Sequence, residues 1–256
     1  MSRKSGQHDN TVRIGLIVPA TPVHFELEHL EKYVGDWLKV KIAWHPTTDK
    51  HALYELRKEG SEAILLAAAA KLITFRPHAV AYACTSISFA SGFDAALQQV
   101  VVIEQRVKVP VTSTSLAFVR AILALGNPPV AVAASYPLKV AEQFVRFLEE
   151  AGIRTVSFSV GDATTGAEAN QFTLKEVGAL VTQANCNEAG VVLVPDTAIN
   201  TLDYLADLED ACGKPLLTAN QVTLWDVLRV ASALRPLPQL GKLLTLPMVL
   251  PPNASV

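Results

Sequence analysis

Short, almost purely apolar runs alternate along this chain with longer segments whose apolar residues recur at helical spacing. The predicted strands are 14–18, 40–44, 79–83, 130–134, 156–160 and 191–194. Their continuous hydrophobicity is typical of parallel strands that are covered on both faces. The predicted helices include 138–150, 174–184 and 202–211, with Gly152 and Gly213 where helix C-caps are expected. Such an alternation predicts an α/β fold with parallel sheets.

Three pairs of short stretches recur in the same order in the first and second parts of the chain. The pairs are 14–19 with 130–135, 79–88 with 191–200, and 110–116 with 215–221. Each match alone is weak, because short apolar strands resemble one another by chance, but three in order favour an internal duplication. We therefore expect two pseudo-symmetric parallel-sheet α/β halves, with the site in the cleft between them.

The same pattern predicts where the halves begin and end. We expect a disordered leader over 1–11, a first α/β half over 12–126 and a second half over 127–229. The link between the halves is rich in glycine, asparagine and proline, which favour turns. The Pro-rich segment 230–256 is expected to pack across the two halves.

Composition and charge exclude several classes of partner. The 256 residues carry a formal net charge of −2, which gives no electrostatic footprint for nucleic acid or an anionic membrane. No apolar run reaches the roughly 18 residues that a membrane span needs, and the polar N-terminus lacks the apolar core of a signal peptide. Three widely spaced cysteines argue against a disulfide framework and for a reducing compartment. We expect a cytoplasmic protein that acts on a small molecule.

Two reactive side chains follow matched strands of the duplicated pattern. Cys84 follows the run 79–83, and Asp196 follows the run 191–194 after one proline. Ligands of open α/β sheets bind beyond the carboxyl ends of the strands, so both side chains are candidates for chemistry on one ligand. The alternatives are a small buried thiol at Cys84 and a helix N-cap at Asp196.

Small polar side chains gather at the same strand-to-helix turns. Hydroxyl and amide groups of this kind suit carboxylate binding, although turn and cap roles explain each of them equally well. The candidate substrate-binding residues are Pro19, Thr85, Ser86, Tyr136, Thr197 and Asn220. Tyr136 follows the run 130–134 and is either a phenolic hydrogen-bond donor or an aromatic lid.

Several motifs with chemistry of their own are absent. The sequence has no Gly-rich dinucleotide or phosphate loop, no HExxH of zinc proteases and no GxSxG nucleophile elbow. Cys186 and Cys212 have no cysteine or histidine at metal-ligand spacing, so we expect no metal. The six histidines lie in polar or loop contexts, and none is matched between the halves. A cofactor-free acid–base or thiol mechanism is what remains.

Three stretches together resemble the maleate isomerase and arylmalonate decarboxylase branch of the Asp/Glu racemase superfamily. They are 13–19, 83–86 and 213–225, of which the last is the most specific. The likeness extends over nearly the whole chain, from about residue 12 to residue 229. The resemblance implies a cofactor-independent enzyme of two pseudo-symmetric halves, with a cysteine at one or both matched strand ends. It also implies a homodimer or homotetramer.

The resemblance assigns roles to individual residues. Cys84 matches the first-half cysteine, which is the nucleophile of maleate isomerases, and Thr85 and Ser86 match a turn that binds the substrate carboxylate. Tyr136 matches a family tyrosine that contacts this carboxylate, and Asn220 belongs to an Asn-Gln signature near the site. The alternative for the Asn220 segment is that it supports the architecture.

Two departures separate this chain from the family pattern. Asp196 replaces the second cysteine, and Pro22 replaces the asparagine usual in the first turn of maleate isomerases. Arylmalonate decarboxylases keep only the second-half cysteine, so the cysteine pattern of this chain is the reverse of theirs.

Three functions follow as hypotheses. The first is a cofactor-independent isomerase of the maleate isomerase type, acting on a small carboxylate or dicarboxylate through Cys84 and Asp196. The second is an arylmalonate-type decarboxylase whose enediolate is protonated by Cys84. The third is a non-catalytic carboxylate-binding relative linked to ectoine utilisation.

Overall fold

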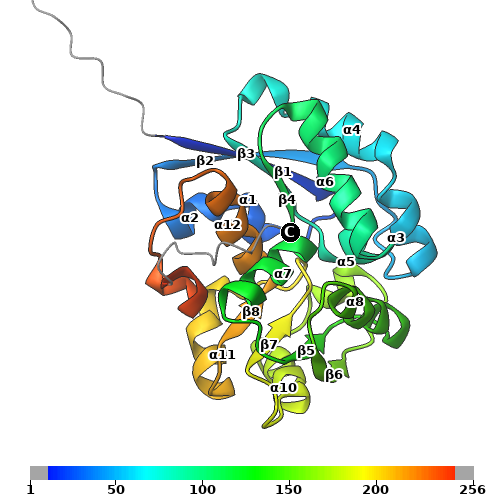
Figure 1. Ribbon diagram of the computed structural model, residues 1–256, viewed down its shortest axis with the longest axis vertical. Coiled ribbons are helices and arrows are strands. Elements are labelled where there is room, and N and C mark those ends of the chain that lie inside the picture. The colour runs from blue at the N-terminus through cyan, green and yellow to red at the C-terminus, as the bar shows by residue number, and fades with distance from the viewer. Residues whose placement is uncertain (1–10, 246–256) are drawn as a thin grey trace, which may run out of the picture.

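The computed structural model describes residues 11–245. The predicted leader therefore lies outside the described residues except for Thr11, and so does the end of the Pro-rich segment, from residue 246 onward. Figure 1 shows two layers of strands, one above the other, with helices around and between them. Among the described residues, no helix has the length and apolar character that crossing a membrane requires.

The first four strands form one all-parallel sheet in the upper part of Figure 1. They are β1 (Val12–Pro19), β2 (Leu38–His45), β3 (Ala79–Tyr82) and β4 (Val111–Ser113). Their order in the sheet is β2-β1-β3-β4, and β1 pairs with both β2 and β3. The buried side chains of β1 and β3 lie in the middle of the sheet, which is why these runs are continuously apolar.

The last four strands form a second all-parallel sheet with the same order. They are β5 (Val130–Ala134), β6 (Thr155–Val160), β7 (Val191–Val194) and β8 (Leu216–Thr218). Their order is β6-β5-β7-β8, so each strand occupies the place of its counterpart four strands earlier. The predicted α/β fold of two matched parallel-sheet halves is confirmed.

Helices connect consecutive strands in both halves, as right-handed parallel crossovers require. The α-helices are α1 (Phe25–Glu28), α2 (Leu30–Val34), α3 (Leu53–Glu59), α4 (Glu62–Ala70), α5 (Thr85–Phe89), α6 (Phe93–Val107), α7 (Thr114–Ala124), α8 (Leu138–Glu150), α9 (Gly166–Ala169), α10 (Leu174–Ala184), α11 (Leu205–Cys212) and α12 (Ala219–Val230). The short 3₁₀ helices are η1 (Ile73–Phe75), η2 (Leu202–Tyr204), η3 (Pro238–Leu240) and η4 (Lys242–Thr245).

Most predicted elements have the observed bounds to within one or two residues. The predicted helices 138–150 and 174–184 coincide with α8 and α10. The predicted helix 202–211 is divided, because η2 precedes α11. Gly213 ends α11 with a φ of 67°, and Gly152 follows α8 with a φ of 76°, the left-handed region that glycine adopts without strain.

The two sheets are joined by α7 and α12, which pack against each other between them (Figure 1). Thr114 Oγ1 of α7 lies 2.7 Å from Thr223 Oγ1 of α12. Nearby, Arg120 Nη1 of α7 donates to Asp226 Oδ2 of α12 at 2.8 Å, and both side chains are buried. A buried charge pair of this kind keeps its partners in one arrangement, because losing either charge leaves the other unpaired. The halves are therefore joined by specific polar contacts as well as by apolar packing.

Candidate active site

A cavity lies where the carboxyl ends of the two sheets meet. It has a volume of about 350 Å³, including the solvent at its mouth. Pro19, Cys84 and Ser86 line it from the first half, and Asp196 and Thr197 line it from the second. The structure thus brings together five of the eight candidate residues from distant parts of the chain. Only small ligands fit such a site.

Cys84 is the last residue before α5 and is separated from the end of β3 by Ala83. Its side chain is buried, with 5% of its surface exposed, and its Sγ lies 3.7 Å from Ser86 Oγ. Burial raises the pKa of the Cys84 thiol to about 12, and hydrogen bonds from Ile87 N–H and Ser86 only partly oppose this rise. Near pH 7 the Cys84 side chain is therefore a neutral thiol, which can donate a proton, rather than a thiolate.

Asp196 follows β7 through Pro195 and is 4% exposed. Its Oδ1 accepts a hydrogen bond from Ala198 N at 2.9 Å, and its Oδ2 accepts one from Ser135 Oγ at 2.5 Å. Both oxygens act as acceptors, which is the role of an ionised carboxylate. No α-helix starts at Asp196 in the described chain, so its alternative interpretation as a helix N-cap is wrong. The aspartate closes a short turn and faces the cavity.

His51 reaches Asp196 from the opposite half. Its Nε2 lies 3.9 Å from Asp196 Oδ2, while its Nδ1 lies 2.8 Å from Ala163 O. A carbonyl accepts only, so Nδ1 carries the hydrogen of its contact with Ala163, and Nε2 faces the Asp196 carboxyl group. The ring also packs edge-on against Tyr136, with centroids 4.9 Å apart. Sequence analysis did not select this histidine.

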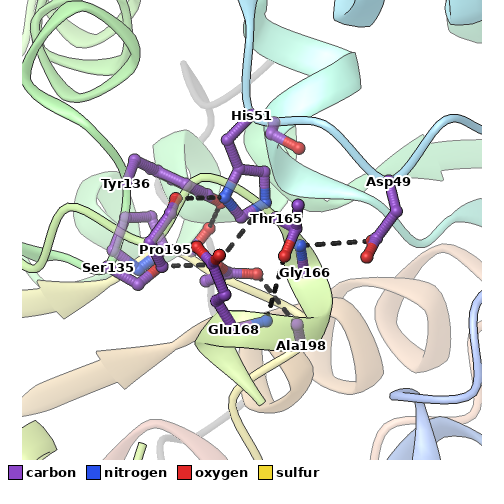
Figure 2. A network of polar contacts seen from close by, with 12 residues as sticks. Asp49, His51, Ser135, Tyr136, Thr165, Gly166, Glu168, Pro195 and Ala198 are labelled. Atoms are coloured by element: carbon purple, nitrogen blue, oxygen red, sulfur yellow. Dashed lines mark hydrogen bonds and ion pairs between the residues drawn. The ribbon is translucent and has the colours of Figure 1, made fainter. Parts of the chain in front are cut away.

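The loop that carries His51, residues 46–52, fastens the two halves at the mouth of the cavity; we call it the clasp. Asp49 Oδ1 accepts from Gly166 N at 3.1 Å and Oδ2 accepts from Ala167 N at 3.0 Å, as Figure 2 shows for Gly166. Lys50 forms an isolated antiparallel bridge with Thr165. A Cβ on Gly166 would lie 2.6 Å from Asp49 Oδ1, so glycine permits the close approach. The clasp places His51 beside Asp196.

Three candidate residues lie behind the lining rather than in it. Thr85 is fully buried, and its Oγ1 has no hydrogen-bond partner among residues 11–245. Tyr136 donates its hydroxyl hydrogen to Pro195 O at 2.5 Å (Figure 2), and burial raises its pKa well above the usual value. Tyr136 is therefore a buried neutral phenol that supports the turn before Asp196, and its interpretation as an aromatic lid is wrong.

Asn220, at the start of α12, also lies behind the site. Its Nδ2 donates to Glu26 Oε2 at 2.7 Å and, less closely, to Thr197 O at 3.3 Å. Glu26 in turn accepts from Leu202 N at 2.5 Å. Asn220 thus supports the turn after Asp196 and links it to α1 of the first half.

Sequence analysis missed several residues that line the cavity. They are Thr21, Val23, His24, Thr47, Asp49, Lys50, His51, Leu56, Glu59, Ile87, Gly166 and Ala198. Many of them lie on the loops after β1 and β2, and the rule that ligands bind beyond strand carboxyl ends was the available signal. Among the described residues, no group of three or more His, Cys, Asp or Glu is arranged to hold a metal ion.

Solved structures of known fold are similar to this chain over most of its length. A maleate isomerase from Pseudomonas putida with maleate superposes with a TM-score of 0.81, at 19% identity, over 92% of this chain and 98% of that one. A Nocardia farcinica maleate cis-trans isomerase with a covalently bound succinylcysteine intermediate gives a TM-score of 0.81, at 20% identity, with the same shares of 92% and 98%. A liganded arylmalonate decarboxylase variant gives 0.79 at 22% identity, over 91% and 98%. These likenesses show a common fold.

Sequence comparison goes further. The arylmalonate decarboxylase of Bordetella bronchiseptica is 32% identical over 154 residues, which are 57% of this chain. The match spans less than two thirds of that relative, 62% of its length. The sequence profile of the arylmalonate decarboxylase family matches residues 14–244. This match covers both sheets and the cavity between them, and the chain belongs to the arylmalonate decarboxylase family.

Proposed function

We propose that the protein is a cofactor-independent isomerase that acts on a small unsaturated or α-substituted carboxylate through Cys84 and Asp196. The observation that carries this proposal is that the two side chains line one cavity from the matched strand ends of the two halves. Each is nearly buried, so a bound ligand would meet both of them away from bulk water.

The resting states of the two groups suit a proton exchange. The Cys84 thiol is neutral because burial raises its pKa to about 12, whereas Asp196 holds two hydrogen bonds as an acceptor. In the proposed step the Cys84 sulfur bonds to one alkene carbon while its proton passes to Asp196. The electron pair of the double bond moves to the carbon next to the substrate carboxylate, and Asp196 returns the proton to that carbon.

Rotation about the new single bond then changes the geometry. Asp196 removes a proton from the same carbon, the double bond re-forms, and the sulfur leaves and regains its proton. No atom is gained or lost over the cycle, as an isomerisation requires. The covalent succinylcysteine in the related Nocardia farcinica enzyme supports a cysteine nucleophile for this fold. A decarboxylase is less favoured because Asp196 stands where the resemblance places the decarboxylase cysteine.

The remaining expectations are also proposals. The substrate is a small carboxylate, and the homodimer or homotetramer implied by the resemblance can be measured by sedimentation. We also propose a cytoplasmic location, which fractionation tests.

A mass-spectrometric and NMR screen in deuterated water tests the function. Small unsaturated and saturated mono- and dicarboxylates are incubated with the wild type, and cis–trans conversion or deuterium uptake beside the carboxylate is followed. The wild type converts or labels at least one compound, and Cys84→Ser does not. The matched control Cys212→Ser changes a buried cysteine at the end of α11 that does not line the cavity, and keeps the activity.

Two results would contradict the proposal. One is equal turnover by the wild type and Cys84→Ser. The other is carbon dioxide release from malonates without any conversion or exchange of other substrates, which would establish the decarboxylase instead.

A further inference from the structure

The charged side chains that line the cavity are mostly acidic. Asp49, Glu59 and Asp196 contribute three carboxylates, against Lys50 and His51. No arginine is among the described residues that line the cavity, so the bidentate guanidinium that commonly holds a carboxylate is missing from this set. A ligand that carries two negative charges would enter a site with too few cations to match them.

The carboxylates are also held in place by hydrogen-bond donors. Glu59 Oε1 accepts from Thr48 N at 2.6 Å, and Glu59 Oε2 accepts from Thr47 Oγ1 at 2.7 Å. Asp49 and Asp196 each accept from backbone N–H groups. These contacts fix the positions of the acidic side chains, and like charges a few ångströms apart repel each other strongly where water is excluded. The lining therefore repels a second substrate carboxylate.

One uncharged polar group in the lining has no partner. His24, on the loop after β1, is buried with 3% of its surface exposed, and its Nε2 lies 3.1 Å from Thr21 Oγ1. Its Nδ1 has no hydrogen-bond partner within residues 11–245. Burial lowers the pKa of His24 to about 4, so the ring stays neutral at physiological pH. A buried polar atom without a partner is unfavourable, and a ligand group that bonds to it removes this penalty.

We infer that the substrate is a small monocarboxylate whose second polar group is uncharged, such as a carboxamide, and that His24 binds this group. The inference rests on the proposed function, because it names the substrate class of the same site. A neutral imidazole offers a donor or an acceptor without charge, which matches both ends of an amide. Asp196 excludes the dicarboxylate by repulsion, and His24 selects the amide by hydrogen bonding.

Calorimetric titration with succinate, succinamate and butyrate tests the inference on the wild-type protein at pH 7.5 and low salt. The three ligands are saturated and cannot add the Cys84 thiol. Succinate and succinamate have nearly the same size and differ in one charge. We expect succinamate to bind at least about 10-fold more tightly than succinate, since a single charge repulsion at short range is of this order.

Two variants separate charge from hydrogen bonding. Asp196→Asn is expected to tighten succinate binding about 10-fold and to leave succinamate nearly unchanged. His24→Leu is expected to weaken succinamate about 10-fold without changing butyrate, and His24→Gln restores part of the loss. His45→Leu is the matched control: His45 is equally buried, has an unpartnered Nε2 and does not line the cavity. Melting temperatures show which variants fold.

The outcomes are distinct from those of the proposed function. Succinate binding as tight as succinamate binding in the wild type overturns the inference, and so does an unchanged preference in Asp196→Asn. If His24→Leu unfolds, a partial weakening of succinamate binding in folded His24→Gln, with butyrate binding unchanged, still assigns the contact, whereas unchanged succinamate binding in His24→Gln rules it out. Cys84-dependent exchange of dicarboxylates alone would overturn the inference and keep the isomerase. Succinamate binding without any exchange would keep the inferred substrate class and overturn the isomerase.

Discussion

The two matched strand ends have the same place in the topology and opposite chemical characters. After β3, α5 begins at the residue that follows Cys84, and Cys84 lies among buried groups that keep its thiol neutral. After β7 no helix follows at once, and Asp196 closes a turn in which Ala198 and Ser135 hydrogen-bond to both its oxygens. The difference shows that the strand end supplies position, whereas the residues just after it decide whether that position is neutral or charged.

The largest expected effect comes from replacing the side chain at each of the two strand ends, first singly and then together. Cys84→Ala is expected to lower turnover by about 10³-fold or more, and Asp196→Asn by about 10²–10⁴-fold, the usual loss for a nucleophile or an acid–base group. The double variant should be no slower than the worse single variant, because the two groups act as one unit. Steady-state kinetics on whichever substrate the screen identifies checks this. Losses that multiply would mean that the two ends act independently.

The pH dependence of alkylation tests the neutral character of the first end. With a pKa of about 12, the Cys84 thiolate fraction rises about 10-fold per pH unit, so iodoacetamide labelling should rise about 100-fold from pH 7 to pH 9. Peptide mass mapping separates Cys84 from the other two cysteines. In urea the rise should level off near the ordinary thiol value. A plateau below pH 9 in the folded protein would show that the site stabilises the thiolate.

Glu26 tests whether the first half supports the second strand end, because it connects α1 to the residues behind the Asp196 turn. Burial raises its pKa from 4.5 to about 7, so the folded state holds a proton that the unfolded state loses between these values. Its stabilising contribution is present below pH 4.5 and is lost as the pH rises to about 7. At pH 8, Glu26→Gln removes the buried charge but also gives up one of the two acceptor oxygens, so the free energy of unfolding should rise by only about 1 kcal/mol.

Chemical denaturation at pH 4 and pH 8 measures this effect. The gain should be much smaller at pH 4, where the wild-type carboxyl is already protonated. Glu28→Gln, on the exposed face of the same helix, is the matched control and should change little at either pH. A stability gain that does not depend on pH would contradict the ionisation of Glu26.

The clasp gives the smallest expected effect. Asp49→Ala removes two hydrogen bonds to the backbone N–H groups of Gly166 and Ala167, and should lower the free energy of unfolding by about 1 kcal/mol. Because the clasp holds His51 beside Asp196, turnover should fall with little change in melting temperature. Asp36→Ala, an exposed aspartate, serves as the control. Unchanged kinetics would show that the second strand end does not depend on the first half.

The sequence was sufficient to predict the architecture because continuous apolar runs and an ordered internal repeat are local signals. The runs at β1, β3, β5 and β7 are buried on both faces and are therefore continuously apolar. Such runs can be recognised in the sequence without knowledge of the rest of the fold. The strands β4 and β8 were not predicted, because each has three residues and ends in Ser or Thr. Short strands of this kind are defined by their pairing partners rather than by periodicity.

The site was predicted only in part, and for a physical reason. Cys84 and Asp196 were predicted because strand ends are places that a sequence pattern can locate. His51 was missed because its position depends on the docking of the clasp to residues 163–167, a contact between distant segments. Tyr136 and Asn220 were predicted at the site, but neighbouring turns separate them from the cavity. No sequence pattern predicts which turns lie between a side chain and the cavity.

The equal strand order of the two sheets also has a consequence for the evolution of the site residues. β3 ends at Tyr82 and β7 ends at Val194, so Cys84 and Asp196 stand outside the hydrogen-bonded ladders that hold the sheets together. A duplicated ancestor would pass on two such positions facing one ligand, and each can be exchanged while its twin is retained. Exchanging either residue would therefore change the chemistry on one face of a ligand without removing a hydrogen bond of either ladder.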